Sequence, residues 1–224
     1  MIMKPEKQNI IIIGASGHSK VVIDIIERLN NYNIIGLIDT YKSKRNKIFH
    51  YEILGTEENL YSLIKEFNIY AGIIAIGDNW IRKTIHEKIT KMIPDFKFIS
   101  AIHPNAIIGK NVKIGKGTVI MPGAIVNCDS KIGDYCILNT KSSLGHDGIM
   151  KNFSSLAPNA TVGGNTVIGI GAAICLGANV IQNITIGNHS IIGAGSLVNR
   201  DIEGNKMAYG IPAKPIRTII NEEK

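Results

Sequence analysis

Residues 131–168 read KIGDYC-ILNTKS-SLGHDG-IMKNFS-SLAPNA-TVGGNT-VI, a series of six-residue units whose second residue is always aliphatic. The same period continues in both directions without a slip. At the roughly one-half apolar usage of ordinary chains, seventeen consecutive aliphatic residues at this spacing arise by chance about once in 10^5. The seventeen positions are Ile102, Ile108, Ile114, Ile120, Val126, Ile132, Leu138, Leu144, Met150, Leu156, Val162, Ile168, Ile174, Val180, Ile186, Ile192 and Val198.

A six-residue period fits neither an α-helix nor an ordinary β-strand. It is typical of a parallel β-helix, in which three units complete one triangular coil, so that residues eighteen apart lie above one another. We expect the aliphatic residue to point inward. The residue four positions later is mostly small, as at Ala124, Ser130 and Cys136, and should lie at the turn. The unbroken register predicts about five coils with no inserted loop.

The N-terminal part has a different pattern, in which short apolar runs alternate with segments of helical periodicity. We expect strands at Asn9–Ile13, Ile34–Ile38 and Gly72–Ile76, and helices from Gly17 to about Asn30, at Thr56–Phe67 and at Asn79–Ile93. Strands that alternate with helices indicate a small parallel α/β domain of Rossmann-like type. The sequence therefore predicts an α/β domain over residues 1–100 and an all-β parallel β-helix with a short C-terminal cap over residues 101–224.

Composition limits the class of protein. With 45% hydrophobic and 19% charged residues, the chain fits a globular protein. The apolar run Ile10–Ile13 is too short for a signal peptide or a membrane span, so we expect a cytoplasmic protein with no membrane partner. The net charge is +7, but the basic residues are scattered and no nucleic-acid motif accompanies them, so we expect small polyanions rather than nucleic acid as partners. Cys128, Cys136 and Cys175 lack metal-type spacing, and we expect buried thiols.

The turn Gly14-Ala-Ser-Gly-His18 lies between a predicted strand and a predicted helix, where backbone amides and the helix dipole favour anions. It lacks the third glycine of the dinucleotide fingerprint. Together with Leu37-Ile38-Asp39 and with IAIGDN and IRK at residues 74–83, GASGHSKVVIDI at residues 14–25 resembles one family of hexapeptide-repeat acyltransferases. That family contains the sialic acid O-acetyltransferases and the bacillosamine-pathway N-acetyltransferases of UDP-linked amino sugars.

The resemblance implies a left-handed β-helix, although parallel crossovers are normally right-handed. It also implies that the α/β domain holds the nucleotide of a nucleotide-linked sugar. The positions that carry over are Ser16, Gly17 and His18 at the turn, Asp39 and Thr40 after the second strand, and Gly77 after the third. Many members have a second acid where this chain has Thr40.

The stretch from Asn139 to Asp147 is the best candidate for the chemistry. Acyl transfer from a thioester to an amine needs a base for the amine proton and a hydrogen-bond donor for the developing oxyanion. His146 suits the base, and Asp147 is suited to orient its imidazole; the family pattern NT-x-x-x-x-x-HD implies this role. Gly164 follows His146 by eighteen residues and should lie about 4.8 Å away in the next coil. In the family this glycine offers its N–H to the thioester oxygen.

Four further positions are expected to bind acetyl-CoA as a co-substrate. Leu176 and Ala194 are also eighteen apart, on another edge, and in the family they line the acetyl-CoA path. Lys214, in the segment GIPAK, is a candidate phosphate contact. Ser155 stands where family members often carry a second histidine beside the acetyl group; it can form a hydrogen bond there but carries no charge. The family also implies a homotrimer with each acetyl-CoA between adjacent prisms.

We therefore expect an N-acetyltransferase that acts on the amino group of a nucleotide-diphosphate-linked sugar, with a 4-amino sugar favoured, by direct attack and without a metal, in the synthesis of a glycan or surface polysaccharide. One alternative is O-acetylation of a sialic acid or related sugar. A second is a zinc hydratase on the same fold, but His103, His146 and His189 are 43 residues apart, which is not a multiple of eighteen. A third is a non-catalytic binding protein.

Overall fold

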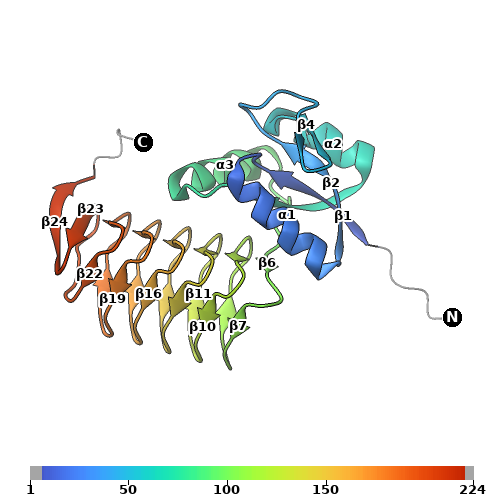
Figure 1. Cartoon of the computed structure of the whole chain (residues 1–224). Coiled ribbons are helices and arrows are strands. Elements are labelled where there is room, and N and C mark those ends of the chain that lie inside the picture. Colours follow the sequence, from blue (N-terminus) through green and yellow to red (C-terminus); the bar gives the residue numbers. More distant parts are fainter. Residues whose placement is uncertain (1–6, 220–224) are drawn as a thin grey trace.

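The structure is a computed structural model that describes residues 7–219. Its N-terminal α/β domain consists of β1 (Gln8–Ile13), α1 (Gly17–Leu29), β2 (Tyr32–Ile38), β3 (Lys47–Ile48), β4 (Tyr51–Gly55), the short 3-10 helix η1 (Glu57–Asn59), α2 (Leu60–Phe67), β5 (Ile69–Ile74) and α3 (Asn79–Met92). The five strands form one sheet in the order β3-β4-β2-β1-β5. All pairs are parallel except β3 with β4. This part lies above one end of a long triangular prism (Figure 1).

The central strand explains why this sheet forms. Ile10, Ile11, Ile12 and Ile13 are all fully buried, because helices or the prism cover both faces of a parallel sheet. Ile10 and Ile12 share a core cluster with α1 and with outward-facing residues of the prism. Ile11 and Ile13 share another with α2, α3 and two aromatic residues of the prism. The α/β domain and the prism are therefore joined by continuous apolar packing.

The structure differs from the sequence prediction at three elements. The third predicted strand lies at Ile69–Ile74 rather than at Gly72–Ile76, because its pairing with β1 runs from Asn9 to Ile13 and the strand ends where β1 ends. The helix predicted from Thr56 begins with the 3-10 turn η1 and becomes α-helical at Leu60. The hairpin of β3 and β4 was not predicted, since two such short strands leave little periodic signal.

The prism is built from seventeen strands of two residues each. They form three parallel β-sheets, one on each face of the prism. The first face contains β6 (Ala101–Ile102), β9 (Val119–Ile120), β12 (Ile137–Leu138), β15 (Ser155–Leu156), β18 (Ala173–Ile174) and β21 (Ile191–Ile192). The second contains β7 (Ile107–Ile108), β10 (Ile125–Val126), β13 (Ser143–Leu144), β16 (Thr161–Val162), β19 (Asn179–Val180) and β22 (Leu197–Val198). The third contains β8 (Lys113–Ile114), β11 (Lys131–Ile132), β14 (Ile149–Met150), β17 (Val167–Ile168) and β20 (Thr185–Ile186).

The register of these strands confirms the eighteen-residue coil. Leu138 pairs with Ile120 on one side and with Leu156 on the other, and the same shift relates the other neighbours in each face. The second residue of every strand is the repeat aliphatic, and these residues are buried from Ile120 to Val198. At the open end Ile108 is 37% exposed, because no earlier coil covers it. After the last coil, β23 (Lys206–Gly210) pairs with β21, and β24 (Ala213–Thr218) pairs antiparallel with β23.

The corners of the prism explain the small residues of the repeat. Ser142 and Thr166 are completely buried, and each hydroxyl bonds to a backbone carbonyl of a turn. Cys136 is buried in the same kind of position. The expectation that all three cysteines are buried is wrong for Cys128, which follows the repeat aliphatic Val126 by two positions rather than four and is exposed. Cys175 is half-buried. Within residues 7–219, no helix is both long and apolar enough to cross a membrane.

Candidate active site

Three loops meet at the carboxyl edge of the α/β sheet. They follow β1, β2 and β5 and contain, respectively, Gly14–Gly17, Asp39–Lys42 and Ala75–Asp78. β2 and β4 lie on one side of the central strand β1, and β5 lies on the other, so the order of the strands reverses at β1. Such a switch point opens a crevice at the carboxyl ends of the strands, where α/β proteins bind ligands. The predicted substrate-binding residues all lie on these loops or at the start of α1.

Asp39 ties two of these loops together. Its Oδ2 accepts a hydrogen bond of 2.7 Å from the N–H of Ala15, and its Oδ1 accepts bonds from the N–H groups of Tyr41 and Lys42. The Lys42 ammonium in turn donates to the carbonyl of Ala15. The carboxylate therefore fixes the shape of the crevice, and much of its accepting capacity is used within the protein.

The first turn of α1 is open to a ligand. Ser16 is the N-cap residue, but its side chain accepts no capping bond, and both Ser16 and Gly17 are exposed. His18 is half-buried, and its Nε2 atom has no hydrogen-bond partner among the described residues. Burial, followed by the charge of Arg82, lowers the pKa of His18 to about 4. The imidazole is therefore neutral near pH 7 and can accept or donate a single hydrogen bond per nitrogen.

Thr40 is backed by a carboxylate that sequence reasoning missed. Its hydroxyl donates to Oε2 of Glu57, a residue of η1 that is only 3% exposed. The Lys88 ammonium lies 3.2 Å from the same oxygen. The chain therefore carries an acid behind position 40, supplied by a residue seventeen positions later. No sequence signal indicates this pairing, because it depends on how η1 packs against the loop after β2.

A cavity of about 410 Å³ lies between the α/β domain and the first face of the prism. One wall contains Gly77 and the beginning of α3, and the other contains Ser155 and residues of the next two coils. Its lining residues are Gly77, Asp78, Asn79, Trp80, Ile81, Ser155, Gly171, Ala173 and Ile191. The structure thus brings together Gly77 and Ser155, which were predicted to bind the sugar nucleotide and acetyl-CoA, respectively.

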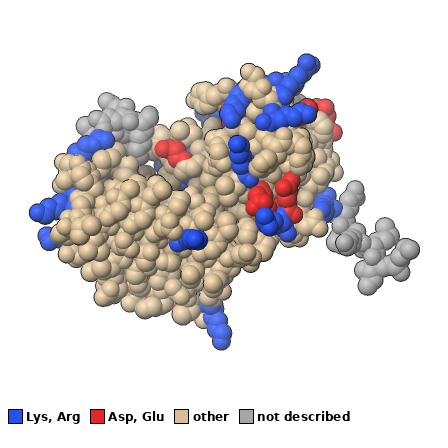
Figure 2. Space-filling model, viewed as in Figure 1, with Lys and Arg blue, Asp and Glu red and all other residues tan. Residues whose placement is uncertain are grey.

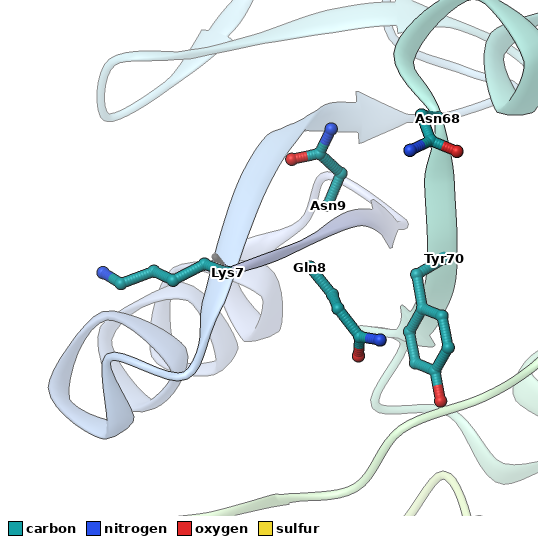
Figure 3. Close-up of a pocket in the computed structure, with 5 residues that line it drawn as sticks. All are labelled: Lys7, Gln8, Asn9, Asn68 and Tyr70. Atoms are coloured by element: carbon teal, nitrogen blue, oxygen red, sulfur yellow. The ribbon is translucent and has the colours of Figure 1, made fainter. Parts of the chain in front are cut away.

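A polar pocket of about 280 Å³ lies elsewhere in the α/β domain. Lys7, Gln8, Asn9, Asn68 and Tyr70 line it. Figure 3 shows these residues around the beginnings of β1 and β5. This is the opposite end of the strands from the three loops, so the pocket is not part of the candidate site.

The candidate base lies on the prism edge between the second and third faces. His146 Nδ1 is 2.8 Å from Oδ2 of Asp147, and both side chains are more than half exposed. This bond favours the tautomer with hydrogen on Nδ1, which leaves the Nε2 lone pair free to accept a proton. Asp147 adopts a left-handed backbone conformation, with φ of 57°, as do Asp129 and Asn165 at the same turn position of the neighbouring coils.

Gly164 lies directly beside this imidazole in the next coil. A Cβ atom on Gly164 would stand 2.6 Å from His146 Nε2, which is closer than any side chain can approach. Among the described residues the N–H of Gly164 has no hydrogen-bond acceptor. The edge therefore places a proton acceptor beside a buried glycine whose N–H bonds to no described residue, and acyl transfer requires these two groups.

One chain does not bring all the predicted site residues together. The edge that carries His146 is opposite the first face, on which Ser155 and the cavity lie. Leu176, which is 59% exposed, and Ala194 lie on the edge between the first and second faces, and Lys214 is exposed on β24. The predicted base, acetyl-CoA path and sugar-nucleotide crevice thus occupy different sides of one prism.

The three histidines considered for a zinc site lie on three different edges. His103 is between the first and second faces, His146 between the second and third, and His189 between the third and first. His103 is also buried, with Nδ1 accepting the N–H of Asn105. Across residues 7–219, no three His, Cys, Asp or Glu side chains gather in the way a metal ion requires. The histidines of one chain therefore do not fit a shared zinc ion.

Comparisons with known proteins match both parts of the chain. Residues 9–89 match the family model described as PglD N-terminal domain, and residues 111–146 match the model described as bacterial transferase hexapeptide (six repeats). A UDP-N-acetylbacillosamine N-acetyltransferase from Bacillus subtilis (strain 168) is 36% identical over 114 residues, which cover 51% of this chain and 51% of that protein.

Two solved structures match over nearly the full chain. One is a histidine-to-asparagine variant of perosamine N-acetyltransferase from Caulobacter crescentus in complex with CoA and GDP-perosamine, with 32% identity and a TM-score of 0.88 over 93% of this chain and 97% of that one. The other is the acetyltransferase domain of PglB from Neisseria gonorrhoeae FA1090 in complex with acetyl coenzyme A, with 33% identity and a TM-score of 0.86 over 94% and 100%. These matches confirm the expected fold, an N-terminal α/β domain followed by a left-handed β-helix.

Proposed function

The chain belongs to the family of nucleotide-amino-sugar N-acetyltransferases, and we propose that it transfers the acetyl group of acetyl-CoA to the amino group of a nucleotide-diphosphate-linked sugar, with a 4-amino sugar favoured. The observation that carries the proposal is the contact between the His146 imidazole, oriented by Asp147, and the glycine at position 164 with its free N–H. The relatives that bind CoA together with an amino-sugar nucleotide support it.

The mechanism is a direct attack with no acyl-enzyme. The neutral sugar amine attacks the thioester carbonyl, and Nε2 of His146 takes the proton that the nitrogen loses. The Gly164 N–H donates to the oxyanion that forms on the carbonyl oxygen. When the intermediate collapses, the C–S bond breaks and the CoA sulfur leaves as a thiolate, which receives the proton from the imidazolium. Asp147 stabilises that imidazolium while it exists.

The two parts of the chain divide the binding between them in this proposal. Residues 1–100 hold the nucleotide through Ser16, Gly17, His18, Asp39, Thr40 and Gly77. Residues 101–224 bind acetyl-CoA through Ser155, Gly164, Leu176, Ala194 and Lys214. The open first turn of α1 and the neighbouring Lys42 supply the N–H groups and the positive charge that a diphosphate needs.

A homotrimer is part of the proposal, because one chain leaves the base and the cavity on opposite sides of the prism. A second copy whose His146 edge faces the first copy's cavity would close the site. The outward residues of the second face, which borders the His146 edge, are all uncharged: Ile107, Ile125, Ser143, Thr161, Asn179 and Leu197. Figure 2 shows few charged side chains on this part of the prism, which suits contact with another copy.

Thiol release from acetyl-CoA tests the function. We expect rapid release with nucleotide-linked amino sugars, from a panel of GDP, UDP, dTDP and CMP carriers, and only slow release with an amino sugar that lacks the nucleotide. His146→Ala should lose kcat by 10²–10⁴-fold. Acetylation of a free sialic acid in place of every amino sugar would instead establish the O-acetyltransferase alternative. An unchanged rate in His146→Ala would contradict the mechanism, and a fully active monomer in light scattering would contradict the shared site.

A further inference from the structure

Arg82, on the first turn of α3, is a charged residue buried at the junction of the α/β domain and the prism. It is only 1% exposed. Its Nη1 atom donates hydrogen bonds to the carbonyl oxygens of Ile76 and Gly77, each at 3.0 Å. Those two carbonyls belong to the loop after β5, which forms one wall of the cavity. Arg82 therefore holds this loop from behind.

The remaining hydrogens of the guanidinium bond to the prism and to the helix itself. Nε donates to the carbonyl of Tyr135 at 2.9 Å, and Nη2 donates to the carbonyl of Phe153 at 3.0 Å and to Oδ1 of Asn79 at 2.7 Å. All five N–H donors of the side chain are thus used. Among the described residues, no backbone N–H bonds to the carbonyl of Tyr135 or Phe153, so Arg82 supplies the partner that these buried groups need.

The residues that α3 contacts form one column on the prism. Tyr135, Phe153, Gly171 and His189 are each eighteen positions apart, on the edge between the third and first faces. The Asn79 amide donates to the carbonyls of Gly171 and Ala172, each at 3.2 Å. The ring of Trp80 meets the ring of His189 edge-on at 6.4 Å. The first turn of α3 therefore contacts four successive coils through Arg82, Asn79 and Trp80.

No carboxylate of the described residues forms an ion pair with Arg82, so its charge is held by carbonyl and amide oxygens. No ion pair of Arg82 exists within residues 7–219, and the nearby Asp78 carboxylate accepts the N–H groups of Trp80 and Ile81 as the N-cap of α3. Burial lowers the pKa of Arg82 to about 10, so the group stays charged at neutral pH. A buried charge without an ionic partner costs stability. A neutral side chain has fewer N–H donors and would bind fewer of these carbonyls. The buried charge is therefore best explained by the four carbonyls that it holds in place.

We propose that Arg82, assisted by Asn79, is a positioning residue that fixes the Gly77 loop against the prism and thereby sets where a nucleotide-held sugar meets the acetyl-transfer face. This inference rests on the proposed function. The sugar amine is tethered to the nucleotide through the diphosphate, so a shift of the loops moves the amine by a similar amount. A misplacement of about 1 Å costs about 10²-fold in rate.

The kinetic test compares Arg82→Gln and Arg82→Lys with Arg28→Gln, which removes an exposed arginine from α1 that pairs only with Asp24 in the helix surface. For Arg82→Gln we expect kcat with a nucleotide-linked amino sugar to fall about 10²-fold. The KM for acetyl-CoA and the slow rate with an amino sugar that lacks the nucleotide should stay within about threefold. Arg82→Lys should be impaired too, because lysine lacks the planar fork.

Hydrogen–deuterium exchange gives a readout that does not depend on activity. We expect faster exchange in Arg82→Gln at the Gly77 loop and the first turn of α3, with α1 and the far coils of the prism unchanged. Asn79→Ala should give a smaller change at the same sites and keeps the test usable if Arg82→Gln does not fold. Equal losses with tethered and free acceptors, or unchanged exchange at α3, would overturn the proposal. If the wild-type enzyme acetylates no nucleotide-linked sugar, the proposed function fails while the exchange result still decides the role of Arg82.

Discussion

The Nε2 atom of His146 lies 2.6 Å from the point where Gly164 would carry a Cβ atom. The two residues are eighteen positions apart and occupy the same edge of consecutive coils. Any side chain at position 164 would therefore displace the imidazole, and the peptide N–H beside it would be shielded from a thioester oxygen. The position of the His146 imidazole therefore depends on the absence of a side chain at Gly164.

Gly164→Ala tests this arrangement. Gly164 does not have a positive φ, so alanine fits its backbone and the added methyl group acts mainly on His146. We expect kcat to fall at least 10²-fold, as for the loss of an aligned base or oxyanion donor, with little change in the melting temperature. Gly204→Ala is the matched control, since its Cβ would meet only the Asn188 backbone, at 3.2 Å and beyond. A fully active Gly164→Ala enzyme would exclude the proposed role of this glycine.

Asp147→Asn should lower kcat less than His146→Ala does. The amide keeps the size of the side chain but loses the charge that stabilises the imidazolium and favours hydrogen on Nδ1. Asp129→Asn is the control, since Asp129 lies in the preceding coil of the same column and bonds to Asn111 instead. An Asp147→Asn enzyme with the same kcat as Asp129→Asn would argue against an orienting carboxylate.

The neutral His18 should make stability depend on pH. The pKa of His18 in the folded protein is about 4, below the ordinary histidine value of 6.5, so the unfolded chain binds more protons between these two pH values. The free energy of unfolding should therefore decrease as the pH falls from 6.5 to 4, by an amount on the order of 2–3 kcal/mol for this residue. Burial also lowers the pKa of His86, which adds a change of the same sign. Unfolding free energies of His18→Gln, measured by urea titration at several pH values, should change less between pH 6.5 and pH 4 than those of the wild type. An equal change in both proteins would refute the assignment.

Cys128 provides a probe of the same edge. It is exposed, whereas Cys136 is buried, and it precedes His146 by eighteen residues. Burial raises the pKa values of the Cys136 and Cys175 thiols, so both should react slowly with a thiol reagent at neutral pH. We expect a bulky reagent to modify Cys128 first, to inhibit the enzyme, and to be slowed by acetyl-CoA. Cys128→Ser should keep its activity and resist inhibition; inhibition of that variant at the same rate would place the effect elsewhere.

The repeat made part of the candidate site predictable. In a prism with a constant coil, the sequence distance between two residues fixes whether they share an edge, so the neighbours Leu176 and Ala194 follow from counting alone. The same counting separates His103, His146 and His189. The loop residues of the α/β domain were expected one by one from the family resemblance. The structure places them at one edge because the loops after parallel strands meet there whatever their sequence. The hydrogen bonds that the Asp39 carboxylate accepts from Ala15 and from its own loop were not predictable in this way.

The sequence by itself determined the coil, its register and the vertical contact between His146 and Gly164, because a repeating backbone turns spacing along the chain into position in space. Only the tertiary structure decided how the α/β domain sits on the prism: that the guanidinium of Arg82 reaches the carbonyls of Tyr135 and Phe153, that Glu57 lies behind Thr40, and that Ser155 faces away from the base. These contacts join segments with no common period. They are set by which apolar surfaces pack together, and that depends on the shapes of both parts at once.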